Sequence, residues 1–100
     1  MIEKKEYKYE KAVLVGLITK DQDEEKLTEY LDELEFLAYT AGASVEKRFT
    51  QKMLQPDSRT FVGSGKAEEI RSYIQEHEIG TVIFDDELSP SQLKNLEREL

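Results

Sequence analysis

The alternation of apolar runs with charged, periodic segments predicts three strands and three helices. Residues 11–18 are almost continuously apolar, which is typical of a strand buried on both faces of a parallel sheet. Residues 43–53 alternate in part, and residues 81–84 are short, apolar and β-branched, so both are predicted strands. Residues 1–10 are charged and have no clear period, so we expect a lead-in that could be disordered.

The first and strongest predicted helix covers residues 21–42. Asp21 and Glu24 have the spacing of a capping box, and Gly42 can adopt the left-handed conformation that ends a helix. A single apolar stripe with spacings of three and four is expected to face the sheet. Its members are Leu27, Tyr30, Leu31, Leu34, Leu37, Ala38 and Ala41.

Two further helices follow, each with a recognisable start. The second is expected to begin near Ser64 or Gly65 and to run to residue 78. The third has Ser89 as N-cap, Pro90 at the first helical position and Gln92 to complete a capping box. Its predicted apolar stripe is Leu93, Leu96 and Leu100.

The resulting order β-α-β-α-β-α predicts an α/β fold. We expect a small, mostly parallel sheet of three to four strands with helices packed on its faces. Gly16, inside the first strand, suggests the close approach of another backbone. A βα unit usually returns to the sheet, so the chain is expected to be a fragment whose next strand is missing. The unpaired sheet edge would then invite self-association.

Composition limits the chemistry of the chain. One hundred residues fit one small domain. There is no cysteine and His77 is the one histidine, so disulfides and thiolate metal sites are excluded and a zinc site is not expected. No apolar run reaches the length of a membrane span, and the N-terminus lacks a signal-peptide core. These features predict a cytoplasmic protein.

The net charge of −8 argues against general nucleic-acid binding, but the charge is segregated along the chain. Residues 21–35 sum to −7 and residues 44–66 sum to +3. The second segment could meet a polyanion such as RNA, with Phe49 or Phe61 stacking on an unpaired base, although Phe49 is better suited to the core. Alternatively, both segments are solvated surface. The candidate RNA-contacting bases are Lys47, Arg48, Lys52, Arg59 and Lys66.

A glycine-flanked helix start at residues 63–66 is a candidate anion site. Backbone N–H groups at such a start can bind an anion, and the lysine adds charge. A phosphate-binding loop would need glycine at Thr60 and a hydroxyl residue at Ala67, so that pattern is not met. The alternatives are a plain glycine-rich turn and, less expected, a nucleotide site. The four residues are Gly63, Ser64, Gly65 and Lys66.

Three acidic residues follow the last predicted strand. Ligands of open parallel sheets lie beyond the carboxyl ends of strands, so Asp85 and Asp86 are weak candidates for holding magnesium. The simpler interpretation is that Asp85, Asp86 and Glu87 solvate the strand end and precede a helix N-terminus. No arrangement of catalytic residues is evident, so no enzymatic activity is expected of this chain.

Four segments, taken together, resemble the N-terminal domain of the HflX-type ribosome-associated GTPases. The clusters TAGA, GSGK and FDDELSPSQ, in this order and spacing, are more specific than any single motif in the chain. The similarity covers about residues 11–100. The matching segments are AVLVGL (12–17), LDELEFLAYTAGASV (31–45), QKMLQPDSRTFVGSGKAEEI (51–70) and VIFDDELSPSQLKNLE (82–97).

The resemblance implies an N-terminal α/β subdomain followed, in family members, by a helical hairpin and a GTPase domain that uses GTP and Mg²⁺. Such proteins bind the 50S subunit near the peptidyl-transferase region of 23S rRNA, and several split stalled ribosomes under stress. The N-terminal region would help to dock on rRNA and couple to the GTPase domain. ATP binding has also been attributed to this region in some members.

This chain contains no GxxxxGK[ST] motif, so GTP hydrolysis cannot be assigned to it, and the hairpin and GTPase domain are absent from it. We therefore expect residues 11–100 to be a ribosome-docking and regulatory subdomain, without a cofactor of its own. Two alternatives stay open. One is an ATP-binding domain that uses residues 63–66, and the other is a structural spacer that regulates the GTPase domain.

Overall fold

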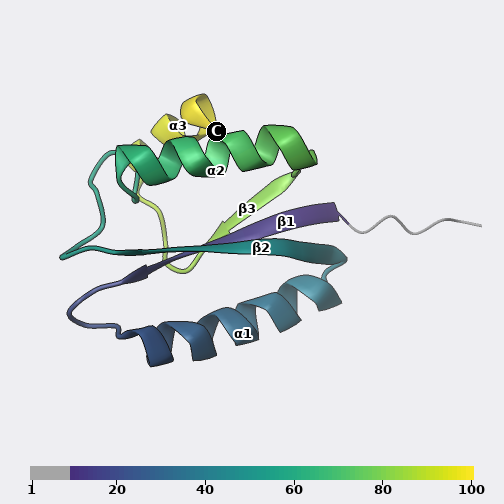
Figure 1. Ribbon diagram of the computed structural model, residues 1–100, viewed down its shortest axis with the longest axis horizontal. Coiled ribbons are helices and arrows are strands. Elements are labelled where there is room, and N and C mark those ends of the chain that lie inside the picture. The colour runs from purple at the N-terminus through teal and green to yellow at the C-terminus, as the bar shows by residue number, and fades with distance from the viewer. Residues whose placement is uncertain (1–9) are drawn as a thin grey trace, which may run out of the picture.

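The computed structural model describes residues 10–100, so the predicted lead-in lies outside it except for Glu10, the first residue of β1. Strands and helices alternate strictly along this part of the chain (Figure 1). The elements are β1 (Glu10–Ile18), α1 (Glu24–Thr40), β2 (Ala43–Lys52), α2 (Ser64–His77), β3 (Thr81–Phe84) and α3 (Pro90–Glu99).

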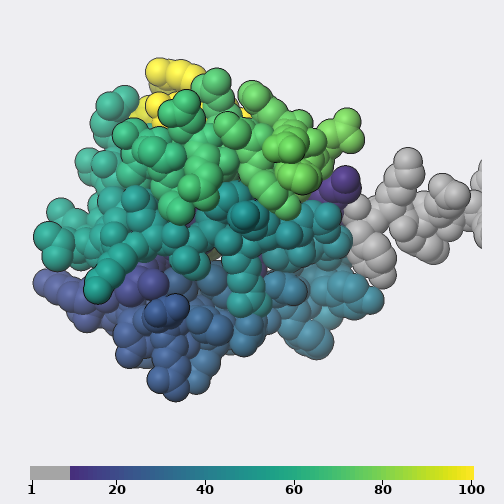
Figure 2. All heavy atoms as spheres, viewed as in Figure 1, coloured from purple at the N-terminus to yellow at the C-terminus, as the bar shows by residue number. Residues whose placement is uncertain are grey.

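The three strands form one parallel sheet in the order β2-β1-β3. Helix α1 covers one face, and α2 and α3 cover the other (Figure 1). The space-filling view shows the same layering, with α1 and α2 on opposite sides of β2 (Figure 2). The predicted α/β fold with a parallel sheet is thus confirmed.

The central strand β1 supplies both halves of the core. Val13 and Val15 pack in the cluster beneath α2 and α3, and Leu14 packs with Leu27 and Leu31 of α1. All three β1 side chains are fully buried. Because side chains of a strand alternate between faces, a continuous apolar run is what a strand covered on both sides requires.

A β-bulge in β2 changes which face its side chains reach. Ala12 pairs with Val45 and Val13 pairs with Lys47, so Glu46 is an extra residue in the ladder. Val45 therefore packs on the α1 face, whereas Phe49 packs on the face of α2 and α3. Regular alternation would have placed these two apolar residues on the same face.

The predicted start of α1 is wrong by two residues. Asp23, not Asp21, is the N-cap, and its carboxylate accepts a hydrogen bond from the Lys26 N–H at 2.8 Å. Thr19 and Gln22 exchange backbone hydrogen bonds of 3.0 and 3.2 Å. This tight turn contains Asp21, so the helix cannot begin until the turn has closed.

Other local predictions were corrected by packing. Tyr30, Leu37 and Leu93 belong to the predicted stripes but are 40%, 52% and 48% exposed, because α1 and α3 each rest on only one layer. The close approach at Gly16 is made by a side chain, not a backbone. A Cβ there would lie 2.6 Å from Cδ1 of Leu27.

Candidate functional site

The loop that leads into α2 is fixed by Asp57. Its Oδ1 accepts hydrogen bonds from the N–H groups of Arg59 and Thr60 at 2.8 and 3.0 Å. These two bonds lower the pKa of the Asp57 carboxyl below its ordinary value, because they favour the charged form. Asp57 also exchanges two backbone hydrogen bonds of 2.9 Å with Phe61. The loop is therefore closed from both ends.

Phe61 anchors this loop in the core at a conformational cost. Its φ of +67° lies in the left-handed region, which is strained for a bulky side chain. The ring is buried and packs edge-on against Phe84, with centroids 5.4 Å apart. Phe49 is equally buried and packs against Tyr73. The hypothesis that Phe49 or Phe61 stacks on an RNA base is therefore wrong, because both rings fill the core.

Helix α2 begins without a side-chain cap. Gly63 is its N-cap and has no side chain to offer, and its own N–H donates to Oε1 of Gln51 at 2.9 Å. Within residues 10–100, no acceptor pairs with the N–H groups of Ser64, Gly65 and Lys66. Unpaired N–H groups and the helix dipole together favour an anion at this position.

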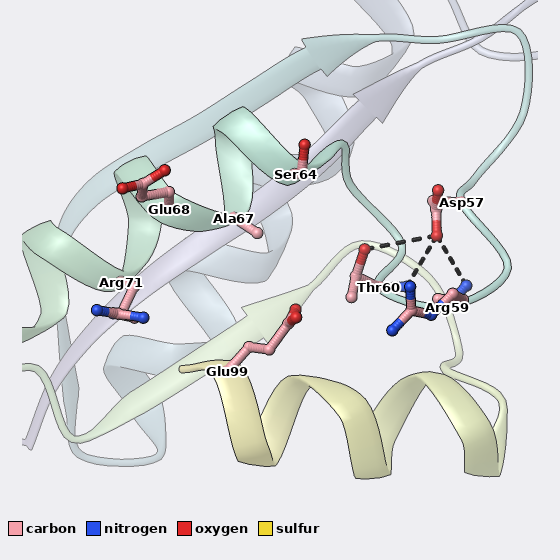
Figure 3. A pocket seen from close by; sticks show the side chains of 8 residues that line it. All are labelled: Asp57, Arg59, Thr60, Ser64, Ala67, Glu68, Arg71 and Glu99. Atoms are coloured by element: carbon pink, nitrogen blue, oxygen red, sulfur yellow. Dashed lines mark hydrogen bonds between the residues drawn. The ribbon is translucent and has the colours of Figure 1, made fainter.

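A hollow of about 480 Å³ lies beside this helix start (Figure 3). Arg59 and Arg71 stand at opposite ends of the view, with Glu99 of α3 between them. Arg71 is not among the site residues predicted from the sequence, although Ser64, Ala67 and Arg71 have the spacing of one helix face. Residues that line the hollow are Asp57, Arg59, Thr60, Ser64, Ala67, Glu68, Arg71 and Glu99.

The basic residues predicted for RNA contact lie in different places. Nζ of Lys47 lies over the rings of Phe49 and Tyr73 on the α2 face, at 5.5 and 5.4 Å from their centroids. Arg48 points to α1, where its Nη2 is 2.8 Å from an oxygen of Asp32 and 3.1 Å from one of Glu35.

Of the remaining three bases, two belong to the start of α2. Arg59 lines the hollow there, and Lys66 lies in the first turn, with its Nζ 3.4 Å from Glu69. Lys52 ends β2 and is exposed. Lys47 and Arg48 are adjacent in the strand and so point to opposite faces of the sheet, and the bases of β2 therefore do not form one patch.

The acidic residues after β3 differ sharply in environment. Oδ2 of Asp85 accepts hydrogen bonds from the N–H of Leu17 at 3.3 Å and from the side chain of Gln22 at 2.8 Å. Burial raises the pKa of the Asp85 carboxyl, since it disfavours the charged form. Asp86 is exposed, and its Oδ1 accepts from the N–H of Glu87. Within residues 10–100, no group of three or more His, Cys, Asp or Glu residues could hold a metal ion.

Residues 28–100 match the family described as "GTP-binding GTPase N-terminal". The match covers the greater part of the chain, including most of α1, the loop before α2 and the capped helix α3. The chain belongs to this family of GTPase N-terminal domains.

The relatives point to one kind of GTPase. The chain is 56% identical over 98 residues to GTPase HflX of Flavobacterium psychrophilum, which covers 98% of this chain and 24% of that protein. It is 41% identical over 91 residues to GTPase HflX of Caldanaerobacter subterraneus, and this alignment covers 91% of this chain and 20% of that protein. It is 40% identical over 90 residues to GTPase HflX of Escherichia coli K12, and this alignment covers 89% of this chain and 20% of that protein.

The chain is therefore an HflX-like GTPase N-terminal domain and spans a quarter or less of the length of these relatives. The predicted resemblance is confirmed. Among the described helices, none combines the length and the apolar character that crossing a membrane would require.

Proposed function

We propose that this chain is the ribosome-docking and regulatory subdomain of an HflX-like GTPase that binds the large ribosomal subunit in the cytoplasm and splits or rescues stalled ribosomes. GTP and Mg²⁺ would act in a separate GTPase domain, and this chain would contribute contacts to 23S rRNA. The family membership supports the link to a GTPase. The contact to rRNA is supported by the geometry of the α2 start.

The observation that carries the proposal is the uncapped N-terminus of α2. Three N–H groups at this helix start have no acceptor in the described part of the chain. Together they could donate to one phosphate-sized anion, which a single side chain could not do as well. Arg59 and Arg71 approach from two sides and could pair with adjacent phosphates of one RNA strand. The net charge of −8 would confine binding to this one edge.

Co-sedimentation with purified large ribosomal subunits over a salt series tests this assignment. The chain should pellet at low salt and be released steeply as salt rises, because each phosphate contact displaces counterions. Arg59→Glu combined with Arg71→Glu should abolish pelleting. Lys20→Glu combined with Lys26→Glu, two exposed changes away from the hollow, is the charge-matched control and should pellet normally. Pelleting that survives the double substitution would sink the proposal.

A second variant tests the backbone part of the site without removing a base. Gly63→Asp supplies the missing cap and places a negative charge where the phosphate would lie. A Cβ at this position lies 3.1 Å from Nε2 of Gln51, the end of a flexible side chain that can move. We expect intact folding and weaker pelleting. Unchanged pelleting would show that the N–H groups take no part.

The competing functions give different results in the same set of experiments. For an ATP-binding domain, calorimetric titration with ATP and Mg²⁺ would release heat that Gly63→Asp abolishes. Lys66, which pairs with Glu69, would have to exchange partners to reach a phosphate. For a structural spacer, the Arg59 and Arg71 substitutions would change the GTPase rate of a parent protein and leave ribosome binding intact.

A further inference from the structure

The face of helix α1 that points away from the sheet is not covered by any other element of residues 10–100 (Figure 1). Glu25, Glu29, Asp32, Phe36 and Tyr39 follow one another along α1 at spacings of three and four, so they form one row on this face. All five side chains are exposed. This outer stripe is acidic over most of the helix and aromatic towards its end.

The aromatic end of the outer stripe borders a hollow between α1 and the edge strand β2. The hollow measures about 430 Å³, and Phe36 and Tyr39 line it together with the half-buried Val45. Phe36 is 67% exposed and Tyr39 is 60% exposed. A single exposed apolar residue is ordinary, but neighbouring aromatic side chains beside a hollow are typical of surfaces that bind another protein.

The charges around this hollow favour a positively charged partner. Among residues 10–100, Arg48 is the one base in the lining, and its Nη2 lies close to two carboxylates, those of Asp32 and Glu35. The side chains of Asp32 and Glu35 are 64% and 45% exposed, so both carboxylates can accept further hydrogen bonds. Helix α1 carries six acids and one base, and no base lies in its last turn, where the helix dipole is negative.

Charge also decides between the possible occupants of the surface. RNA and an anionic lipid surface would both be repelled by the carboxylates of the outer stripe. A second copy of the chain that docked with the same face would set one acidic stripe against another, which like charges oppose. A Lys- or Arg-rich polypeptide meets neither obstacle, because its cations can pair with the carboxylates and lie over the aromatic rings.

We propose that the outer stripe of α1 binds a Lys- or Arg-rich segment of another protein, and that a large apolar side chain of this segment fills the hollow beside Phe36 and Tyr39. Basic side chains of the segment pair with Glu25, Glu29 and Asp32 along the helix. This surface and the start of α2 lie on opposite sides of the sheet (Figure 1). A protein at α1 and RNA at α2 can therefore be bound together, and the two contacts can be tested separately.

Titration of the isotope-labelled chain with the synthetic peptide KRLAKRFLKR tests the surface by amide chemical shifts. We expect saturable shifts along α1 and at Val45, and weaker binding as salt rises, because the charge pairs are exposed. A second peptide of the same charge, with serine in place of each leucine and phenylalanine, should bind about tenfold more weakly or worse. Equal binding of the two peptides, or no saturable shifts with the first, would overturn the proposal.

Matched pairs of variants locate the contact. Phe36→Ser should weaken binding of the first peptide about tenfold, since it removes the aromatic anchor. Leu54→Ser is its control, because Leu54 is an apolar side chain that is 86% exposed elsewhere on the chain. Glu29→Lys should weaken binding several-fold, whereas Glu97→Lys in α3 makes the same change in net charge and should have little effect.

All four substituted positions are exposed, so none of these variants removes part of the core. If either control weakened binding as much as its partner variant, the peptide would not be bound at the outer stripe and the proposal would be wrong. Saturable shifts in α1 with a single-stranded oligonucleotide would reject it in favour of RNA. Shifts at Phe36 and Tyr39 that depend on the concentration of the chain, without any peptide, would reject it in favour of a second copy.

Discussion

Helices α2 and α3 begin in opposite ways. At α3, Oγ of Ser89 accepts from the N–H of Gln92, and the Gln92 side chain accepts from the N–H of Ser89, which completes a capping box. At α2, Gly63 gives no cap, and the preceding Phe61 is held in a left-handed conformation by the core. One helix start satisfies its own N–H groups, and the other leaves them available.

The difference separates a structural helix start from one that is open to a ligand. A capped start is stable without any partner, so selection for folding alone explains α3. The strained residue and the bare N–H groups at α2 cost stability and are maintained by surrounding contacts, as strain at functional sites commonly is. The two starts are also joined, because Nε2 of Gln92 donates to the Asp57 carbonyl at 2.7 Å.

Removing the core anchor should give the largest effect. Phe61→Ala is expected to destabilise the chain by about 3–5 kcal/mol, the usual cost of deleting a buried aromatic ring. Phe61→Gly should cost no more than the alanine variant, because glycine adopts φ of +67° without strain. Urea denaturation of both variants measures this. If the glycine variant were clearly less stable than the alanine variant, the backbone at residue 61 would not be strained.

Removing the link between the two starts should come next. Gln92→Ala leaves the N–H of Ser89 and the carbonyl of Asp57 without their partner. We expect a loss of about 1–3 kcal/mol, the combined net contribution of two part-buried hydrogen bonds. Amide shifts should change in residues 57–61 as well as in α3. Changes confined to α3 would show that the two starts are independent.

Removing a hydroxyl from each helix start compares them directly. Ser89→Ala should cost about 1 kcal/mol, because it deletes the N-cap. Ser64→Ala should be nearly neutral, since Ser64 lies inside α2 and caps nothing. Thermal unfolding of the two variants is the measurement. Equal losses would mean that Ser64 has a structural role that the geometry does not show.

Acidification should have the smallest effect on stability, and it should affect the start of α2 but not the start of α3. The pKa of Asp57 is lowered in the folded chain from its ordinary 3.8, so its stabilising effect is present above pH 3.8 and is lost as the pH falls through the lower, folded value. The capping box of Ser89 and Gln92 has no titratable group. Amide shifts of Arg59 and Thr60 should titrate, and Asp57→Asn should remove that response. If the amide shifts of Ser89 and Gln92 changed over the same pH range, the two helix starts would not differ in their response to acid.

Local sequence signals predicted α3 and the three strands well. The capping box of α3 involves residues three apart, and the apolar runs report burial on two sides of one sheet. The start of α1 was missed because the hydrogen-bonded turn between Thr19 and Gln22 competes with the capping pattern at Asp21. In both cases the deciding interactions span only a few residues.

The candidate sites were harder to predict because their partners are distant in sequence. Arg48 of β2 pairs with Asp32 of α1, and Oδ2 of Asp85 depends on Gln22, which is 63 residues away. The left-handed φ of Phe61 is imposed by the core and contradicts the ordinary preference of phenylalanine. No pattern in the chain encodes these contacts locally.

The bulge at Glu46 acts as a phase shift within β2. Residues before it and residues after it obey the same two-residue alternation, but with opposite assignment of odd and even positions to the two faces. Deleting Glu46 would give β2 one regular alternation along its whole length, so one part of the strand would have to turn over. Either Val45 would move away from α1, or Lys47, Arg48 and Phe49 would exchange faces. One extra residue thus lets a single edge strand place Val45 against α1 and Phe49, four residues later, in the core on the opposite face.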